Sequence, residues 1–242
     1  MRSNFPVGIS GVPDPMKASM VACKLHQFAV EAGIEPFISN SMEEFAEVRN
    51  RLRNQAVSPM FDPSITGLEG KAFWLGGRNS EGRIVSLQAY RIDYIDSNLA
   101  EWAMGWMSGL YMKRHTLMVP QFITPPHNSR SAGVSGRIVY HGEIWIDREL
   151  RGKKIFEIMP FYGMTLAYLK WYPDAMWGLI GNYMATKGYG TRMRYPHLEH
   201  SFFRWSVHPE DIPSNEWLVL AEQTDLDYLM AEFDLEMNVT QV

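Results

Sequence analysis

The sequence is poor in cysteine, in long apolar runs and in excess positive charge, and each shortage excludes a class of protein. Its one cysteine, Cys23, excludes a disulfide within the chain and is typical of a reducing compartment. The net charge of −4 argues against a general nucleic-acid binder, for which a basic domain is expected. The most apolar run, residues 99–112, contains Glu101 and is too short to cross a bilayer. The first fifteen residues lack the apolar core of a signal peptide, so we expect a cytoplasmic protein without a membrane span.

Helical and strand patterns alternate along most of the chain. Residues 1–34 read as a loose arm followed by a helix that Gly33 ends, and Ser41 with Glu44 forms a capping box that opens a second helix. Residues 71–78 and 82–95 predict a hairpin, and from residue 137 strands alternate with helices. This order predicts an α/β fold in which helices cover a mixed sheet. We therefore expect a main domain over residues 35–242, with an inserted helix and loop at about 97–136.

A basic turn lies between a strand that ends at Asp147 and a helix that begins near Ile155. The first N–H groups of a helix have no partner within it, and the helix dipole adds partial positive charge there. Arg151, Lys153 and Lys154 add full positive charges at the same corner. The corner can hold a pyrophosphate, or its basic side chains can simply be solvated.

The segment "IWIDRELRGKKIF" resembles the acyl-CoA-binding segment of the GNAT N-acyltransferase superfamily, in which a strand leads through R-G-K-G-I-G to the helix beneath CoA. The matching residues are Ile146, Asp147, Glu149, Arg151, Gly152, Lys153 and Ile155. A second segment, "GNYMATKGY", resembles the family's N-x-x-A-x-x-x-Y run, with Asn182, Ala185 and Tyr189 at the matching positions.

The resemblance implies a GNAT-like fold with a mostly antiparallel sheet, and transfer of an acyl group from acetyl-CoA or a longer acyl-CoA to a small-molecule amine. It implies that residues 151–155 and Asn182 hold the cofactor, that the backbone near Ile146 engages the acyl carbonyl, and that Tyr189 protonates the departing thiolate. It implies no metal, and the chain could form a homodimer.

Two residues depart from the family's pattern. Lys154 and Phe156 stand where the family has small residues, which let backbone amides approach the pyrophosphate closely. Lys154 can compensate by pairing with phosphate. The alternative is a catalytically inactive GNAT-like binding or interaction protein, in which Phe156 fills the space between the motif strand and the next strand.

Acyl transfer also needs a general base within reach of the amine. Alternation along "YHGEIWI" predicts that His141 and Glu143 share one face of the strand, and Glu143 is the candidate base. The alternative is that Glu143 pairs with a nearby arginine as part of the scaffold. Tyr195 competes with Tyr189 for the role of general acid.

Two further features have a structural and a functional interpretation. His197 and His200 have a spacing that could hold a metal on a helix, but we expect solvated or capping histidines because Pro196 disfavours a helix there. The insertion carries a Met- and Trp-rich stripe, including Trp102 and Trp106, that can wall an apolar pocket or simply belong to the core.

Overall fold

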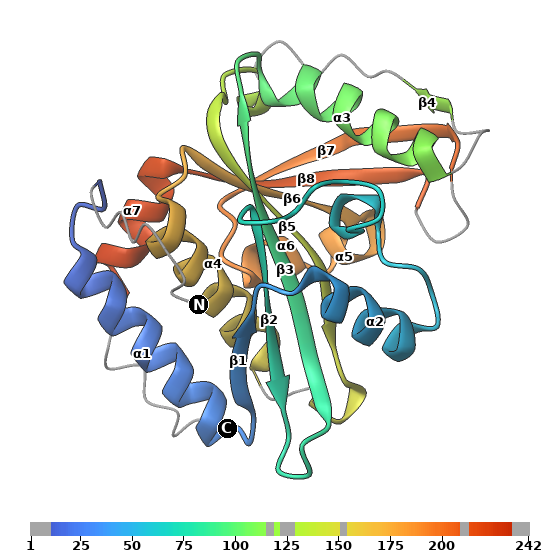
Figure 1. Cartoon of the computed structure of the whole chain (residues 1–242). Coiled ribbons are helices and arrows are strands. Elements are labelled where there is room, and N and C mark those ends of the chain that lie inside the picture. The colour runs from blue at the N-terminus through green and yellow to red at the C-terminus, as the bar shows by residue number, and fades with distance from the viewer. Residues whose placement is uncertain (1–10, 115–118, 122–128, 151–153, 209–212, 234–242) are drawn as a thin grey trace.

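A computed structural model describes residues 11–114, 119–121, 129–150, 154–208 and 213–233 (Figure 1). Within these residues one eight-stranded sheet has the order β1-β2-β3-β5-β6-β8-β7-β4. Its strands are β1 (Glu35–Ser39), β2 (Ala72–Arg78), β3 (Ile84–Ile95), β4 (Val119–Gln121), β5 (Gly136–Ile146), β6 (Ala175–Gly181), β7 (His197–Val207) and β8 (Asn215–Glu222).

Neighbouring strands are antiparallel throughout this sheet, except that β5 and β6 are parallel. The crossover between these two strands is the helix that follows the basic turn, as a parallel pair requires. The predicted fold class is therefore confirmed: the sheet is mixed and mostly antiparallel, and the elements follow the GNAT-like order that the resemblance implies.

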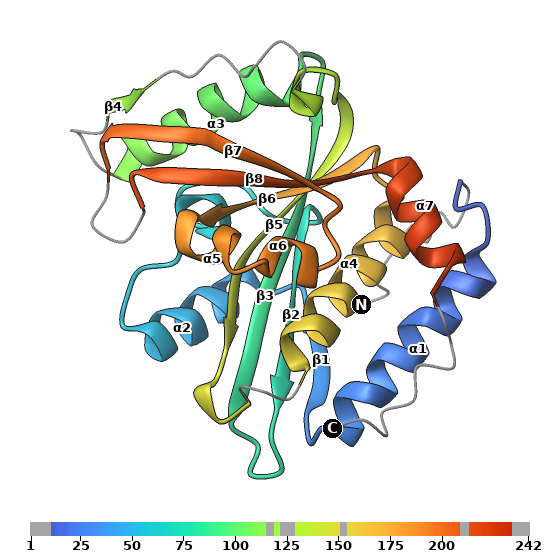
Figure 2. The same cartoon turned by 180° about the vertical axis from the view of Figure 1, so that it is seen from behind.

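Helices cover both faces of the sheet and create two cores. The helices are α1 (Pro15–Glu31), α2 (Met42–Arg53), α3 (Leu99–Arg114), α4 (Ile155–Trp171), α5 (Asn182–Thr186), α6 (Tyr189–Arg192) and α7 (Gln223–Ala231). Figure 1 and the reverse view in Figure 2 show α1, α4 and α7 on one face, and α2 and α3 on the other. The apolar side chains that face the sheet are buried on both sides. None of the helices described is long and apolar enough to span a membrane.

Side chains cap the starts of α2 and α3. The Ser41 hydroxyl accepts the N–H of Glu44 at 3.1 Å, and the Asn98 side chain accepts the N–H of Glu101 at 3.0 Å. Each bond satisfies one of the first amides of its helix, which have no partner within the helix. Gly33, with φ +84°, follows the end of α1 as expected.

The structure differs from the sequence-based prediction within the insertion. β4 lies in a stretch expected to be loop, where it pairs with β7. The "HLEH" segment, in which no helix was expected, lies in β7 and pairs with β8. Cys23 is exposed.

Candidate active site at the fork of the sheet

Strands β5 and β6 pair along only a short seam and then separate. The seam consists of three residue pairs, Ile138–Ala175, Val139–Met176 and Tyr140–Trp177. Beyond it β5 continues beside β3 and β6 continues beside β8. We call the space between β5 residues 141–146 and β6 residues 178–181 the fork. At its base a Cβ on Gly178 would lie 2.6 Å from the carbonyl oxygen of His141, so this strand position requires glycine.

A β-bulge redirects β5 at the fork. Leu87 pairs with Trp145 and Ala89 pairs with Gly142, so two residues of β5 oppose the single Gln88 of β3. Glu143 takes the extra position with φ +57°, a left-handed conformation uncommon for a residue other than glycine.

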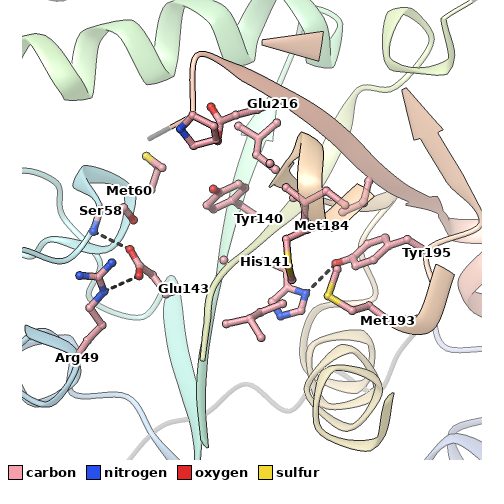
Figure 3. Close-up of a pocket in the computed structure, with 18 of the residues that line it drawn as sticks. Arg49, Ser58, Met60, Tyr140, His141, Glu143, Met184, Met193, Tyr195 and Glu216 are labelled. Carbon is pink, nitrogen blue, oxygen red and sulfur yellow. Dashed lines mark hydrogen bonds and ion pairs between the residues drawn. The ribbon is translucent and has the colours of Figure 1, made fainter. Parts of the chain in front are cut away.

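The bulge overturns the predicted alternation. His141 faces the α4 side, where it contacts Tyr195, whereas Glu143 faces α2 (Figure 3). The expectation that His141 and Glu143 share a face is wrong because the inserted residue shifts the pleat by one position.

An inner cavity of about 280 Å³ occupies the base of the fork (Figure 3). Both separating strands line it, together with α2, α3, the α5–α6 segment and β8. Its polar lining residues include Arg49, Arg53, Ser58, Tyr111, Tyr140, His141, Glu143, Tyr195 and Glu216. Its apolar lining residues include Met60, Ile144, Phe156, Leu179, Ile180, Met184, Met193 and Pro213.

At one end of the inner cavity Glu143 forms a buried ion pair. Its carboxylate accepts Arg49 Nε–H and the backbone N–H of Ser58, both at 2.7 Å. The Arg49 and Glu143 side chains are 5% and 4% exposed. Arg53 Nη1 lies farther from the same carboxylate, at 4.0 Å, and its side chain is 36% exposed, so Arg49 is the main buried counter-charge. Of the two interpretations of Glu143, the contacts favour pairing with an arginine as part of the scaffold.

A second carboxyl group, that of Glu216 on β8, was missed in the sequence. It is 8% exposed and accepts Trp205 Nε1–H at 3.2 Å. Burial raises the pKa of Glu216 to about 7, although the bond from Trp205 opposes this shift. A signal was available, because strand alternation puts Glu216 in phase with the apolar Leu218 and Leu220 and so predicts an inward-facing carboxyl group.

His141 is the centre of a buried hydrogen-bonded network beside the inner cavity. Its Nε2 lies 3.0 Å from Gln88 Oε1 and its Nδ1 lies 3.0 Å from the Tyr195 hydroxyl. Gln88 donates its amide to the carbonyl of Met159, so its oxygen faces the imidazole and accepts the Nε2 proton. The Tyr195 hydroxyl consequently donates to Nδ1.

Burial keeps this network neutral. It lowers the pKa of His141 to about 3 and raises the pKa of Tyr195. Because the Tyr195 proton is held by His141, Tyr195 is poorly suited to the role of general acid.

An outer cavity of about 440 Å³ continues the fork toward the start of α4. It is lined by Arg53, Ile144, Trp145, Ile146, Leu150, Lys154, Ile155, Phe156, Tyr183, Met184, Tyr189 and Arg192. Three of these residues are cationic, and Lys154 is the N-cap residue of α4. Arg192 is partly neutralised by Glu157 at 3.2 Å. The outer cavity thus combines positive side chains with the N-terminus of a long helix.

The predicted cofactor residues are distributed unevenly around this cavity. Ile146, Lys154 and Ile155 line it, and Ile155 is buried beneath it. Asn182 lies outside both linings, where its side-chain oxygen accepts Trp217 Nε1–H at 3.1 Å. Arg151, Gly152 and Lys153 lie outside the described residues.

Phe156 marks the boundary between the two cavities. It lines both of them, as do Arg53, Ile144 and Met184, and its ring packs edge-on against Tyr189 with centroids 4.6 Å apart. Phe156 therefore narrows the fork at one point without filling it. Tyr189 lines the outer cavity only.

The insertion packs mainly against the core. Trp102 and Trp106 of α3 stack with centroids 4.7 Å apart and contact Trp177, and Trp106 also meets Tyr140. Tyr111 is the α3 residue that lines the inner cavity. The Met- and Trp-rich stripe thus mainly covers one face of the sheet as part of the core, and contributes little to a ligand pocket.

The histidine pair has no shared ligand geometry. His197 Nε2 lies 2.8 Å from Asp225, whereas the His200 ring packs edge-on against Trp217. Within the described ranges no group of three or more His, Cys, Asp or Glu side chains is arranged to hold a metal.

No protein-family model matches the chain, and no curated protein sequence matches it. Solved structures do match. FeeM, an N-acyl amino acid synthase from uncultured soil microbes, is 13% identical, with a TM-score of 0.45 over 80% of this chain and 92% of FeeM. Arabidopsis thaliana NAA60 in complex with acetyl-CoA is 12% identical, with a TM-score of 0.44 over 78% of this chain and 98% of its own. A GNAT-family acetyltransferase from Staphylococcus aureus is 10% identical, with a TM-score of 0.41 over 78% and 99%. At these values the likeness concerns the course of the chain and assigns it no residue and no activity.

Proposed function

We propose that the protein transfers an acyl group from an acyl thioester, such as acetyl-CoA or a longer acyl-CoA, to an amine. The observation that carries the proposal is the fork, which opens into two cavities that share Arg53, Ile144, Phe156 and Met184. One cavity has a cationic lining and a helix N-terminus, and the other contains buried carboxyl groups. A donor in the outer cavity and an acceptor in the inner cavity can react where the two cavities meet.

The outer cavity has the properties that a CoA-type donor requires. Helix N-termini bind phosphate groups through unpaired N–H groups and the helix dipole. Lys154, Arg53 and Arg192 line this cavity, and Arg151, Gly152 and Lys153 complete the proposed phosphate site. Lys154 stands where the family has a small residue, and its charge offsets the loss of close backbone approach by pairing with phosphate.

The edge of β5 that has no described strand partner in the fork is the proposed contact for the pantetheine arm of the donor. Beyond Tyr140 the described β6 no longer pairs with β5, so the edge near Ile146 faces the fork. A strand edge of this kind pairs with extended amide-containing groups. Ile146 is therefore proposed to contact the pantetheine arm. Asn182 retains a proposed role in cofactor binding, for which its side chain would have to exchange Trp217 for the ligand.

The reaction needs a proton for the leaving thiolate. Tyr189 lines the outer cavity beside the junction and is the proposed general acid. Its rival Tyr195 donates its proton to His141. Glu143 remains a candidate base from the sequence, but its two hydrogen bonds favour a role in holding the bulge.

One observation favours the alternative of a binding protein without catalysis. The Phe156 ring against Tyr189 narrows the fork where the thioester would have to lie. Replacement of Phe156 by glycine, the residue typical of the family there, distinguishes the acyltransferase from the binding protein without catalysis. An enzyme already able to bind thioesters gains little, whereas a closed binding protein gains thioester binding.

The first test is a calorimetric titration of the wild type with CoA, acetyl-CoA and a long-chain acyl-CoA. We expect binding that Lys154→Glu weakens at least tenfold and that Lys71→Glu, a matched change at an exposed lysine, leaves unchanged. Tyr189→Phe should keep binding and lose turnover. Thiol release with a panel of amines should be followed in a Cys23→Ser background, because the exposed Cys23 would react with thiol reagents. Absence of both binding and turnover with every thioester would refute the proposal.

A further inference from the structure

We infer that Glu216 is the group that takes the proton from a cationic primary amine bound in the inner cavity. This inference rests on the proposed function and names the acceptor class and the catalytic base of the same site. The cavity presents Glu216 on β8 at one end and the Arg49–Glu143 pair at the other (Figure 3). The two carboxyl groups therefore have different tasks.

Glu216 has the contacts of a group left available for a ligand. Its one hydrogen bond to a described side chain is the bond from Trp205, and no described Lys, Arg or His forms an ion pair with it. An ionised carboxylate buried in this way is costly without a counter-charge. Glu143, in contrast, already has Arg49 and the Ser58 amide. An ammonium group entering the inner cavity supplies the missing positive charge to Glu216.

Among the lining groups whose pKa burial shifts, Glu216 is the one whose pKa lies near neutral pH. The titratable and charged residues that line the cavity are Arg49 and Arg53 of α2, Tyr111 of α3, Tyr140, His141 and Glu143 of β5, and Tyr195 between α6 and β7. Burial raises the pKa of Tyr140 well above its ordinary value, and the charges of Glu216 and Glu143 raise it further. His141 is neutral above about pH 3 because burial lowers its pKa. Burial brings the pKa of Glu216 to about 7, where a general base is effective.

The lining also limits the acceptor's size and polarity. A cavity of about 280 Å³ lies just below the usual range for small-molecule sites. Met60, Met184 and Met193 contribute flexible apolar walls. Because Arg49 and Arg53 also line the cavity and would repel a second positive charge, we assign the acceptor as a small primary amine with a single positive charge and an apolar part that contacts the methionines.

In the proposed reaction the amine nitrogen loses two protons and the thiolate gains one. The ammonium gives one proton to the Glu216 carboxylate, and the freed nitrogen lone pair forms a C–N bond with the thioester carbonyl carbon. The C–S bond then breaks and the thiolate takes a proton from Tyr189. The nitrogen loses its second proton, which through solvent restores Tyr189, and Glu216 returns its proton to solvent. The products are an amide, a free thiol and one proton.

The test uses Glu216→Gln, which keeps the side-chain shape and an oxygen for Trp205, with Glu47→Gln on the exposed surface of α2 as the matched control. The binding arm compares hexylamine with hexan-1-ol by calorimetry at pH 8. We expect the wild type and Glu47→Gln to prefer hexylamine, and Glu216→Gln to lose about tenfold or more of that preference. Equal preference in all three proteins would overturn the inference.

The kinetic arm measures kcat/KM for hexylamine across pH 5–9 with the thioester that binds most tightly. General-base catalysis contributes roughly 10²–10⁴-fold, so Glu216→Gln should lose about that factor. The wild-type profile should fall below pH about 7, where Glu216 becomes protonated, and the variant should lack this limb, an outcome that a merely structural role would not produce. Retention of the limb in an active Glu216→Gln protein overturns the inference while leaving the acyltransferase standing. The wild type could instead show no turnover and still prefer hexylamine in a way that depends on Glu216. That result overturns both the proposed acyltransferase activity and the role of Glu216 as a base, and leaves Glu216 only as a binding site for ammonium groups.

Discussion

Replacing Glu216 by glutamine should stabilise the protein at alkaline pH and change how its stability depends on pH. Glutamine keeps the size of the side chain and can accept the Trp205 hydrogen bond, but it carries no charge to bury. In the wild type, the folded protein holds a proton on Glu216 up to about pH 7, whereas the ordinary pKa is 4.5. The folded state therefore binds more protons than the unfolded state between these values, and the free energy of unfolding falls as pH rises through them.

The magnitude follows from the separation of the two pKa values. About 1.4 kcal/mol corresponds to each pKa unit, so the contribution of Glu216 declines by about 3 kcal/mol from below pH 4.5 to above pH 7. Because Glu216 is 8% exposed, solvent screens this effect little. For a chain of this size, 1 kcal/mol corresponds to roughly 2–4 °C in Tm.

The assay is urea denaturation of the wild type, Glu216→Gln and the exposed control Glu47→Gln at pH 5 and pH 8. The gain from Glu216→Gln over the wild type should be small at pH 5 and larger by about 2–3 kcal/mol at pH 8, with no pH-dependent difference for the control. An equal effect of Glu216→Gln at both pH values would refute the reasoning, since it would mean that Glu216 ionises in the folded protein as it does in the unfolded chain. The same substitution is expected to abolish the proposed base, so stability and activity should change in opposite directions.

Three other perturbations test the site and its scaffold. Burial lowers the pKa of His141 to about 3, so the stability that its neutral form provides above pH 6.5 should be lost as pH falls toward 3; acid denaturation should show this loss in the wild type and a weaker one in His141→Gln. Arg49→Met should cost up to roughly 3–5 kcal/mol in denaturant unfolding, because it leaves the buried Glu143 carboxylate with only the more distant and more exposed Arg53, 4.0 Å away, as a counter-charge, and a double variant with Glu143→Gln should recover much of that loss. Gly178→Ala should lower the Tm, because its Cβ would lie 2.6 Å from a backbone oxygen. Gly109→Ala, where a Cβ on α3 would meet no other atom, should stabilise the protein by roughly 0.5–1 kcal/mol. Equal Tm shifts for the two variants would contradict this account.

The order of the elements could be predicted because local signals agree with the global fold. Ser41 lies at a real helix start, and the predicted hairpin of residues 71–78 and 82–95 consists of real antiparallel strands. Such features depend on residues within a few positions of one another. The assignment of the basic corner to the start of α4 was likewise local, since Lys154 is the N-cap residue.

The arrangement of the site depended on interactions that sequence spacing does not reveal. One inserted residue at Glu143 moved its side chain to the opposite face from His141, and the bulge forms against a partner strand about fifty residues earlier. Glu216 becomes part of the site because β8 lies beside β6, a neighbour determined by sheet order. Strand alternation was enough to predict that Glu216 points inward, although that prediction was not made, but alternation does not reveal which cavity receives the carboxyl group.

The short seam between β5 and β6 also has a mechanical consequence. Three residue pairs join the part of the sheet formed by β1, β2, β3 and β5 to the part formed by β6, β8, β7 and β4. Aromatic rings reinforce this line, since Tyr140 and Trp177 lie 4.8 Å apart between centroids and Trp106 of α3 contacts both. The two parts of the sheet are therefore joined by a narrow seam, and α3 packs along it. A ligand that separates β5 from β6 at the fork would strain this seam, and we expect the contacts of α3 with Tyr140 and Trp177 to limit how far the two parts of the sheet separate.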